Sequence, residues 1–176
     1  MRISGTSTGE WIYTHAGRQF KKLSLELGGK NANIIFEDAN FDEAVSTSVR
    51  SSFSNSGQIC LCGSRILVEE GIFDKFVSGN GTPPPSLLTL IGTWFRDQLP
   101  CLIVLCEKTE KLVVGDPKSD STDMGPVNSK PHMERIIKYI NMAQEEGAKI
   151  HTGGPERVHV VGLEDGYFLR PTIITG

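Results

Sequence analysis

Residues Leu23 to Phe36 read LSLELGGKNANIIF, and their pattern is the clearest indication of the fold class in the sequence. Two runs rich in apolar, β-favouring residues flank the Gly28-Gly29 pair. This pattern predicts a strand, a tight turn and a second strand. Cap-forming residues Asp38 to Asn40 follow, and apolar side chains then recur at helical spacing over residues 41–54. The stretch therefore predicts strand and helix in close succession.

The same alternation continues toward the C-terminus. Helices are predicted where apolar residues recur every three or four positions, and strands where short β-favouring runs stand between turns. The further predicted elements are a strand at Arg65 to Glu69, a helix at Glu107 to Val114 and a helix at Ser129 to Glu146. A short strand that begins at Lys149 and a last strand at Tyr167 to Ile174 follow. Alternating strands and helices predict an α/β architecture with a largely parallel sheet.

Residues 78–106 break this pattern. The three consecutive prolines at 83–85 cannot continue the helix predicted from Gly71. Two apolar runs without clear periodicity follow, and each is far shorter than the roughly 20 apolar residues that span a bilayer. We therefore expect an atypical insertion at 78–106, of the kind that a translated intron or a gene-model error would give, and no membrane-spanning segment.

Composition and charge exclude several classes of protein. The chain has 176 residues, which is enough for one packed domain. Its net charge of −3 and the absence of a basic cluster argue against a nucleic-acid partner. The polar residues at 1–11 lack the apolar core of an export signal, so we expect a cytoplasmic protein.

The four cysteines are expected to be reduced thiols, because the chain shows no export signal. A single cysteine is most often a small buried hydrophobic residue, and this interpretation stands for Cys62, Cys101 and Cys106. The pair Cys60-x-Cys62 is spaced more closely than the cysteines of structural zinc sites, and the histidines form no matching pair. We expect no metal site.

Two motifs resemble signatures of the aldehyde dehydrogenase family. LELGGK at 25–30 is similar to the family's glutamate motif, and FSNSGQIC at 53–60 is similar to its cysteine motif. Their order also matches the family, as does the separation of Glu26 from Cys60, 60 − 26 = 34 residues. The resemblance resumes at Glu107 and runs through KLVVGDP and DMGPV to GYFLRPTII. It is strongest to the branch that contains 2-aminomuconic semialdehyde dehydrogenase.

The resemblance implies a partial aldehyde dehydrogenase fold. It comprises the largely parallel sheet of the catalytic domain and the tail end of a Rossmann-like cofactor domain. Residues 1–26 would then be the C-terminal remnant of the NAD-binding domain, and residues 27–77 and 107–176 part of the catalytic domain. The chain stops before the family's Glu-Glu-x-Phe-Gly-Pro segment, so we expect a piece of a longer enzyme. Family members are homo-oligomers, whereas the oligomeric state of such a piece stays open.

The chemistry implied by the resemblance assigns Cys60 and Glu26 separate roles. The Cys60 thiolate attacks a small aldehyde substrate, giving a thiohemiacetal whose oxyanion needs hydrogen-bond donors, among them the backbone N–H of the nucleophile. Loss of hydride leaves a thioester, and Glu26 acts as the general base that activates water to hydrolyse it. The cofactor would be NAD, with NADP possible.

The resemblance also assigns cofactor contacts to Gly5, Thr6, Leu27 and Gly28. Residues 4–9 are similar to the family's Gly-Ser-Thr loop, which leads into a helix and holds the pyrophosphate at its N-terminus. Here Gly9 lies one position nearer Gly5 than the family pattern has it, so a turn without a ligand remains an alternative. For the whole chain, the alternative to an active enzyme is an inactive truncated product that acts as an interaction or structural piece.

Overall fold

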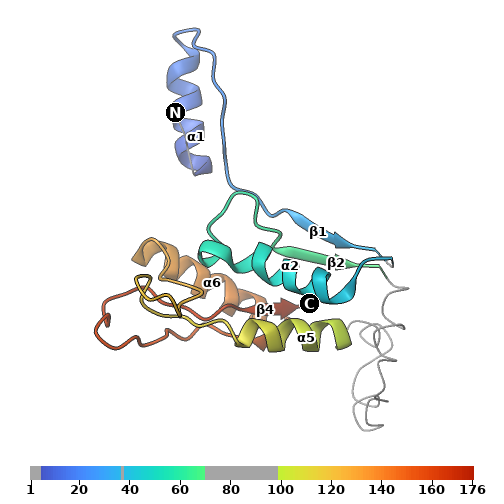
Figure 1. Ribbon diagram of the computed structural model, residues 1–176. Helices are drawn as coiled ribbons and strands as arrows, with labels where there is room; N and C mark the ends of the chain where they lie inside the picture. Colours follow the sequence, from blue (N-terminus) through green and yellow to red (C-terminus); the bar gives the residue numbers. More distant parts are fainter. Residues whose placement is uncertain (1–4, 37, 70–98) are drawn as a thin grey trace.

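The computed structural model describes residues 5–36, 38–69 and 99–176, and it confirms the α/β class (Figure 1). The expected helix start at Gly71 lies outside the described residues. The elements, in chain order, are α1 (Thr6–Gly17), β1 (Ala32–Ile35), α2 (Phe41–Phe53), the short helical turn η1 (Ser54–Gly57), β2 (Arg65–Val68), α5 (Leu99–Glu110), α6 (Lys130–Glu145), β3 (Lys149–Thr152) and β4 (Ile173–Thr175).

The strands form two separate pairs. β1 and β2 are parallel, with Ala32 opposite Arg65 and Ile35 opposite Val68. β3 and β4 are antiparallel, with an irregularity between Ile150 and Thr152. The predicted parallel sheet is therefore present as one parallel pair, and the second pair of strands is antiparallel.

The strand predicted over the first half of LSLELGGKNANIIF is absent. Residues 21–31 carry no regular secondary structure, and the strand begins only at Ala32. A strand needs a neighbour for its N–H and C=O groups. Within the described ranges, the segment before Ala32 has no paired strand, so its β-favouring residues run extended beside solvent.

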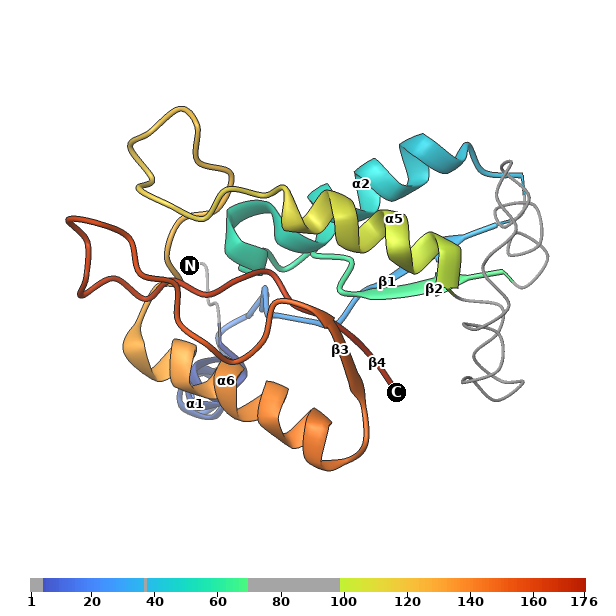
Figure 2. The same cartoon turned by 90° about the horizontal axis from the view of Figure 1, so that it is seen from below.

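Helix α2 covers one face of the parallel pair and packs against α5 (Figures 1 and 2). Its start is fixed by Asn40, whose side chain accepts a hydrogen bond from the Glu43 N–H at 3.2 Å. Val45 and Val49 of α2 are buried together with Leu105 of α5. This cluster is the core that holds the two helices on the sheet.

Helix α5 begins at Leu99, earlier than the predicted start at Glu107, and ends at Glu110 rather than Val114. The apolar run CLIVLC, which shows no clear period by itself, therefore belongs to this helix. Leu105 lies within the predicted insertion at 78–106, yet its side chain is only 6% exposed. Its burial against α2 explains why these apolar residues form a helix here.

A second core cluster lies between helix α6 and the C-terminal part of the chain. Met133 of α6 is buried with Val127 and Leu169, and Ile136 and Ile137 pack against them. The predicted helix at Ser129 to Glu146 is confirmed to within one residue at each end. None of the described helices is long and apolar enough to cross a membrane.

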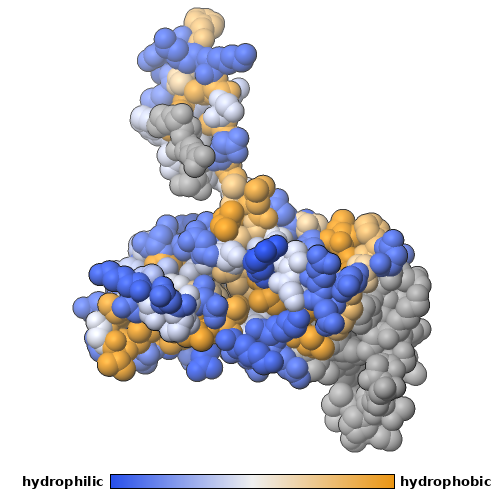
Figure 3. All heavy atoms as spheres, viewed as in Figure 1, coloured by the Kyte–Doolittle hydropathy of each residue, from blue (hydrophilic) through white to orange (hydrophobic). Residues whose placement is uncertain are grey.

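Helix α1 projects from the body on an extended segment (Figure 1). The space-filling view shows it as a separate lobe that carries apolar patches (Figure 3). Trp11 and Tyr13 on this helix are 60% and 62% exposed, so these two large apolar side chains do not pack against the rest of the protein.

A left-handed turn connects α2 to the segment before β2. Asn55, Ser56 and Gly57 have positive φ angles of 51°, 55° and 71°. Such angles are uncommon outside glycine and asparagine, so the surrounding contacts must hold the turn. The Ser56 hydroxyl donates to the Gly125 carbonyl at 2.8 Å, and the Gln58 side-chain carbonyl accepts from the Asn128 N–H at 3.1 Å.

Replacing Leu105 by alanine is expected to lower the free energy of unfolding by about 2–4 kcal/mol, because it leaves a cavity between α2 and α5. The matched control is Leu61→Ala, where the leucine is 78% exposed and the expected change is below about 0.5 kcal/mol. Urea unfolding of both variants measures the difference. Equal effects would show that α5 does not pack as described.

Gly57→Ala is expected to destabilise the protein by about 1 kcal/mol, because an L-residue is strained at φ +71° and the added Cβ would lie 3.3 Å from the Ser52 carbonyl oxygen. Gly17→Ala is the control, since Gly17 lies outside the left-handed region and has no atom within 4 Å of an added Cβ. Thermal and urea unfolding should lower stability for the first variant only. A neutral Gly57→Ala would contradict the left-handed turn.

Candidate active site

Cys60 lies at an exposed turn between the left-handed turn and β2. This turn, residues 59–62, is called the Cys60 turn below. It is closed by the Cys62 N–H, which donates to the Ile59 carbonyl at 3.0 Å. The thiol is therefore presented on a short, hydrogen-bonded loop rather than on a helix or strand.

The other described thiols are less suited to nucleophilic attack. Cys62 is buried, and Cys106 is half-buried on α5. Burial, and then the nearby carboxylate of Glu110, raise the pKa of Cys106. Because the thiolate is the attacking species, a raised pKa leaves Cys106 protonated and unreactive near neutral pH. Among the cysteines whose side chains are described, Cys60 is the exposed one.

Parallel pairing brings the glutamate and cysteine motifs to the same end of the sheet. Glu26 precedes the first residue of β1 by 32 − 26 = 6 positions, and Cys60 precedes the first residue of β2 by 65 − 60 = 5 positions. Since Ala32 lies opposite Arg65, both segments enter the ladder from the same side. Sequence order alone would not reveal this arrangement.

Direct hydrogen bonds join the two segments. The Asn31 side-chain N–H group donates to the Cys60 carbonyl at 2.7 Å and to the Cys62 carbonyl at 3.2 Å. The Arg65 side-chain Nε donates to the Lys30 carbonyl at 2.8 Å, and the Arg65 N–H donates to the Asn31 carbonyl at 3.2 Å. These contacts tie the Cys60 turn to the residues that follow Glu26.

Glu26 itself is exposed, on the extended segment between α1 and β1. Among the described residues, no hydrogen bond or ion pair joins its carboxylate to the Cys60 turn. The structure thus brings the two motifs together through their backbones and through Asn31, and it leaves the Glu26 side chain in solvent.

Three of the residues predicted to contact a cofactor, Gly5, Thr6 and Leu27, lie at the first turn of α1. Gly5 is the N-cap, its carbonyl accepts from the Gly9 N–H at 2.9 Å, and no side chain caps the first turn. Thr6 is the first helical residue. Leu27 lies against this turn, because a Cβ added at Gly9 would come within 2.9 Å of its side chain. Gly28 is exposed, with no atom within 4 Å of an added Cβ.

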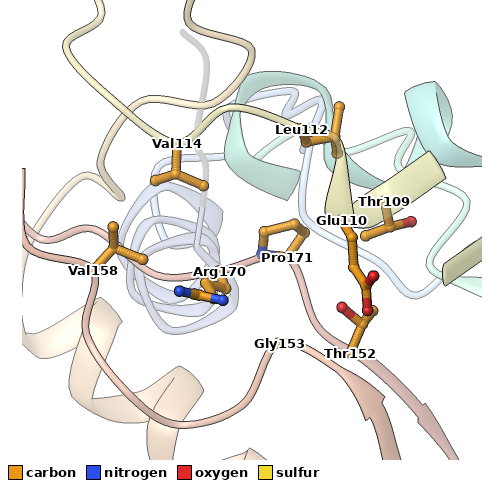
Figure 4. A pocket seen from close by; sticks show the side chains of 9 residues that line it. All are labelled: Thr109, Glu110, Leu112, Val114, Thr152, Gly153, Val158, Arg170 and Pro171. Atoms are coloured by element: carbon orange, nitrogen blue, oxygen red, sulfur yellow. The ribbon is translucent and has the colours of Figure 1, made fainter. Parts of the chain in front are cut away.

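Two cavities lie in the described part of the chain, and neither Cys60 nor Glu26 lines them. A cavity of about 780 Å³ adjoins the Cys60 turn through Lys30, Ser56 and Gly57, and reaches Tyr139 of α6 and the strand β4. A second cavity of about 610 Å³ lies between the end of α5 and the loop after β3 (Figure 4). Glu110 and Arg170 are among the side chains that line it.

The sequence patterns did not identify three residues that support the site. Asn31 holds the Cys60 turn, and Ser56 and Gln58 hold the left-handed turn. The sequence holds a partial signal, because glycine and asparagine adopt positive φ angles more readily than other residues, and Asn55 and Gly57 flank Ser56. The partners at Gly125 and Asn128 are distant in sequence and gave no signal. Within the described ranges, no three His, Cys, Asp or Glu side chains gather where they could hold a metal ion.

Comparison with known proteins identifies the family of this chain. The profile of the aldehyde dehydrogenase family matches residues 3–80 and 101–176. The unmatched residues 81–100 fall inside the predicted insertion. The 2-aminomuconic semialdehyde dehydrogenases of Mus musculus and Danio rerio are 41% and 39% identical over 96% and 97% of this chain. The chain spans only 30% of the length of each.

Solved structures show the same likeness. The betaine aldehyde dehydrogenase of Staphylococcus aureus in complex with NAD+ superposes with a TM-score of 0.78 at 35% identity, over 98% of this chain and 29% of that one. The aldehyde dehydrogenase of Bacillus cereus gives a TM-score of 0.75 at 30% identity, over 97% and 29% of the two chains. Motifs, fold and matched length together lead to one conclusion: the chain belongs to the aldehyde dehydrogenase family.

Proposed function

We propose that the protein carries part of an NAD-dependent aldehyde dehydrogenase site, in which Cys60 is the nucleophile and Glu26 the general base. The observation that carries the proposal is the exposed Cys60 thiol on a turn bound to the segment that follows Glu26. Both motifs enter the parallel ladder from one side, so a single substrate could meet both groups. The reaction oxidises a small aldehyde or semialdehyde to a carboxylic acid.

Each residue has a chemically distinct task. The Cys60 thiolate adds to the aldehyde carbonyl, and a later thioester on the same sulfur stores the acyl group. Glu26 is exposed to water, and its carboxylate takes a proton from the water molecule that hydrolyses the thioester. NAD, when bound, accepts the hydride of the substrate.

The start of α1 fits the phosphates of such a cofactor. Its first turn contains no acidic residue and no side-chain cap, so its backbone N–H groups are available to an anion. Gly5 and Thr6 would hold the pyrophosphate there. Leu27, packed beside Gly9, and the uncrowded Gly28 would lie along the rest of the cofactor. NADP is the alternative cofactor.

A second candidate function is an inactive piece that docks on a full-length subunit. The exposed apolar residues favour it, because contiguous apolar surface marks interaction sites. Ile34 and Leu67 are paired across the parallel sheet and are 57% and 49% exposed, and Trp11 projects from α1. An inactive protein that co-elutes with a full-length aldehyde dehydrogenase in size-exclusion chromatography would support this candidate.

Cys60→Ala is expected to abolish NAD-dependent oxidation of a panel of small aldehydes, because no other described thiol is both exposed and free. The matched control is Cys106→Ala, which removes a half-buried thiol of raised pKa and should leave turnover unchanged. NADH formation, followed at 340 nm, measures both. Equal activity of the Cys60 variant and the unsubstituted protein would overturn the assignment, and no turnover in any form would favour the inactive piece.

Glu26→Gln is expected to slow steady-state turnover by about 10²–10⁴-fold, the range that general-base catalysis contributes. The amide keeps the size of the side chain and removes its basicity, so one rapid equivalent of NADH should still form before hydrolysis limits the rate. Stopped-flow measurement of the first turnover separates the two steps. Loss of that first equivalent along with the steady state would show that Glu26 does not act on the thioester.

A further inference from the structure

Asn31 makes contacts that none of the assigned catalytic roles requires. Its side-chain nitrogen donates to the Cys60 carbonyl at 2.7 Å and to the Cys62 carbonyl at 3.2 Å. One amide nitrogen carries two hydrogens, so both bonds can form together. The Asn31 carbonyl also accepts from the Arg65 N–H at 3.2 Å, which anchors Asn31 itself to the start of the parallel ladder.

The peptide units on both sides of the Cys60 Cα are fixed, the preceding one by the hydrogen bond that closes the turn and the following one by Asn31. All described peptide bonds are trans, and in a trans peptide the C=O and the N–H point in opposite directions. The Ile59 carbonyl is held by the Cys62 N–H, so the Cys60 N–H of the same unit points away from the turn. The Cys60 carbonyl is held by Asn31, so the following N–H, that of Leu61, points away from Asn31.

We propose that Asn31 is a positioning residue for the tetrahedral adduct that forms on Cys60. The proposal rests on the proposed function of Cys60 as nucleophile. When the thiol adds to a carbonyl, an S–C bond forms, the C=O π electrons move to oxygen, and the thiol proton passes to that oxygen. The developing oxyanion is stabilised only by donors whose direction is set beforehand. Asn31 sets the direction of the Leu61 N–H through the Cys60 carbonyl. It also binds the carbonyl of Cys62, the residue whose N–H holds the Ile59 carbonyl and with it the Cys60 N–H.

The same strand supplies a matched control. Asn33 has the same side chain and lies on β1, but its amide donates to the Ser48 hydroxyl of α2 at 2.7 Å. It therefore ties the sheet to the helix and has no bond to the Cys60 turn. Removing it should affect stability without reorienting the peptide units beside Cys60.

The test compares two electrophiles that react with the Cys60 thiol. Iodoacetamide alkylates sulfur by displacing iodide and forms no oxyanion, and peptide mass spectrometry gives its rate at Cys60. An aryl trifluoromethyl ketone adds reversibly to the thiol to give a tetrahedral adduct, and 19F NMR gives its affinity. A change in thiol exposure or pKa alters both probes, whereas misdirected donors weaken the ketone adduct alone.

Asn31→Ala is expected to weaken the ketone adduct by about tenfold while the alkylation rate stays within about twofold, because a small misplacement of positioning groups is costly. Asn31→Asp should weaken it further, since a carboxylate of the same shape accepts only and repels both carbonyls. A purely space-filling role would leave the Asp variant normal. Asn33→Ala should leave the ketone affinity unchanged.

The proposal is overturned if the Ala and Asp variants bind the ketone normally, if both probes change in equal proportion, or if the ketone does not add to Cys60 in the unsubstituted protein. Circular dichroism verifies folding. Should the Asp variant fail to fold, Asn31→Ser, which keeps a shorter donor, must retain more ketone affinity than Asn31→Ala. Neither probe needs NAD or turnover, so a protein that fails to oxidise aldehydes still gives a decisive result.

Discussion

The parallel pairing of β1 with β2 is the contact on which the rest of the site depends. It sets Ala32 opposite Arg65, so the residues that precede both strands meet at one edge. Asn31 and Arg65 then bridge these residues with hydrogen bonds. A shift of the register by one residue would reverse the face of every side chain on the strand and remove Ile35 from the core. Site geometry and core packing are therefore specified by the same register.

The two proposed catalytic groups are held to different degrees. The Cys60 turn is fixed from three sides: by its own closing hydrogen bond, by Asn31, and by the left-handed turn that Ser56 anchors to Gly125. Glu26 lies on an extended segment that is held by the packing of Leu27 beside Gly9 and by the Arg65 bond to Lys30, and among the described residues its own carboxylate has no bond to the Cys60 turn. A nucleophile must be aligned with its donors, whereas a base that acts through water tolerates a longer reach. The closer support of Cys60 is therefore consistent with its proposed role as the nucleophile, and the looser support of Glu26 with its proposed role as the base.

Sequence patterns predicted the amphipathic helices well, since α2 and α6 carry their apolar residues at helical spacing. They did not predict the secondary structure of segments whose conformation depends on contacts with residues distant in sequence. The run LSLEL favours a strand but has no neighbour within the described ranges, and CLIVLC lacks a period yet forms a helix because Leu105 packs on α2. At the site, the motifs identified Glu26 and Cys60 as candidates. The bonds from Asn31 join residues 29 positions apart and could not be read from sequence.

We propose that the acyl group of the substrate is carried on Cys60 and released with the help of Glu26. Intact-protein and peptide mass spectrometry on the Glu26→Gln variant, mixed with NAD and an aldehyde and quenched in acid, tests it most directly. We expect an acyl mass increment that is confined to the Cys60 peptide and that lasts longer than many turnovers of the unsubstituted protein. Oxidation of the aldehyde without a Cys60 adduct, or an adduct on Cys62 or Cys106 instead, would contradict it.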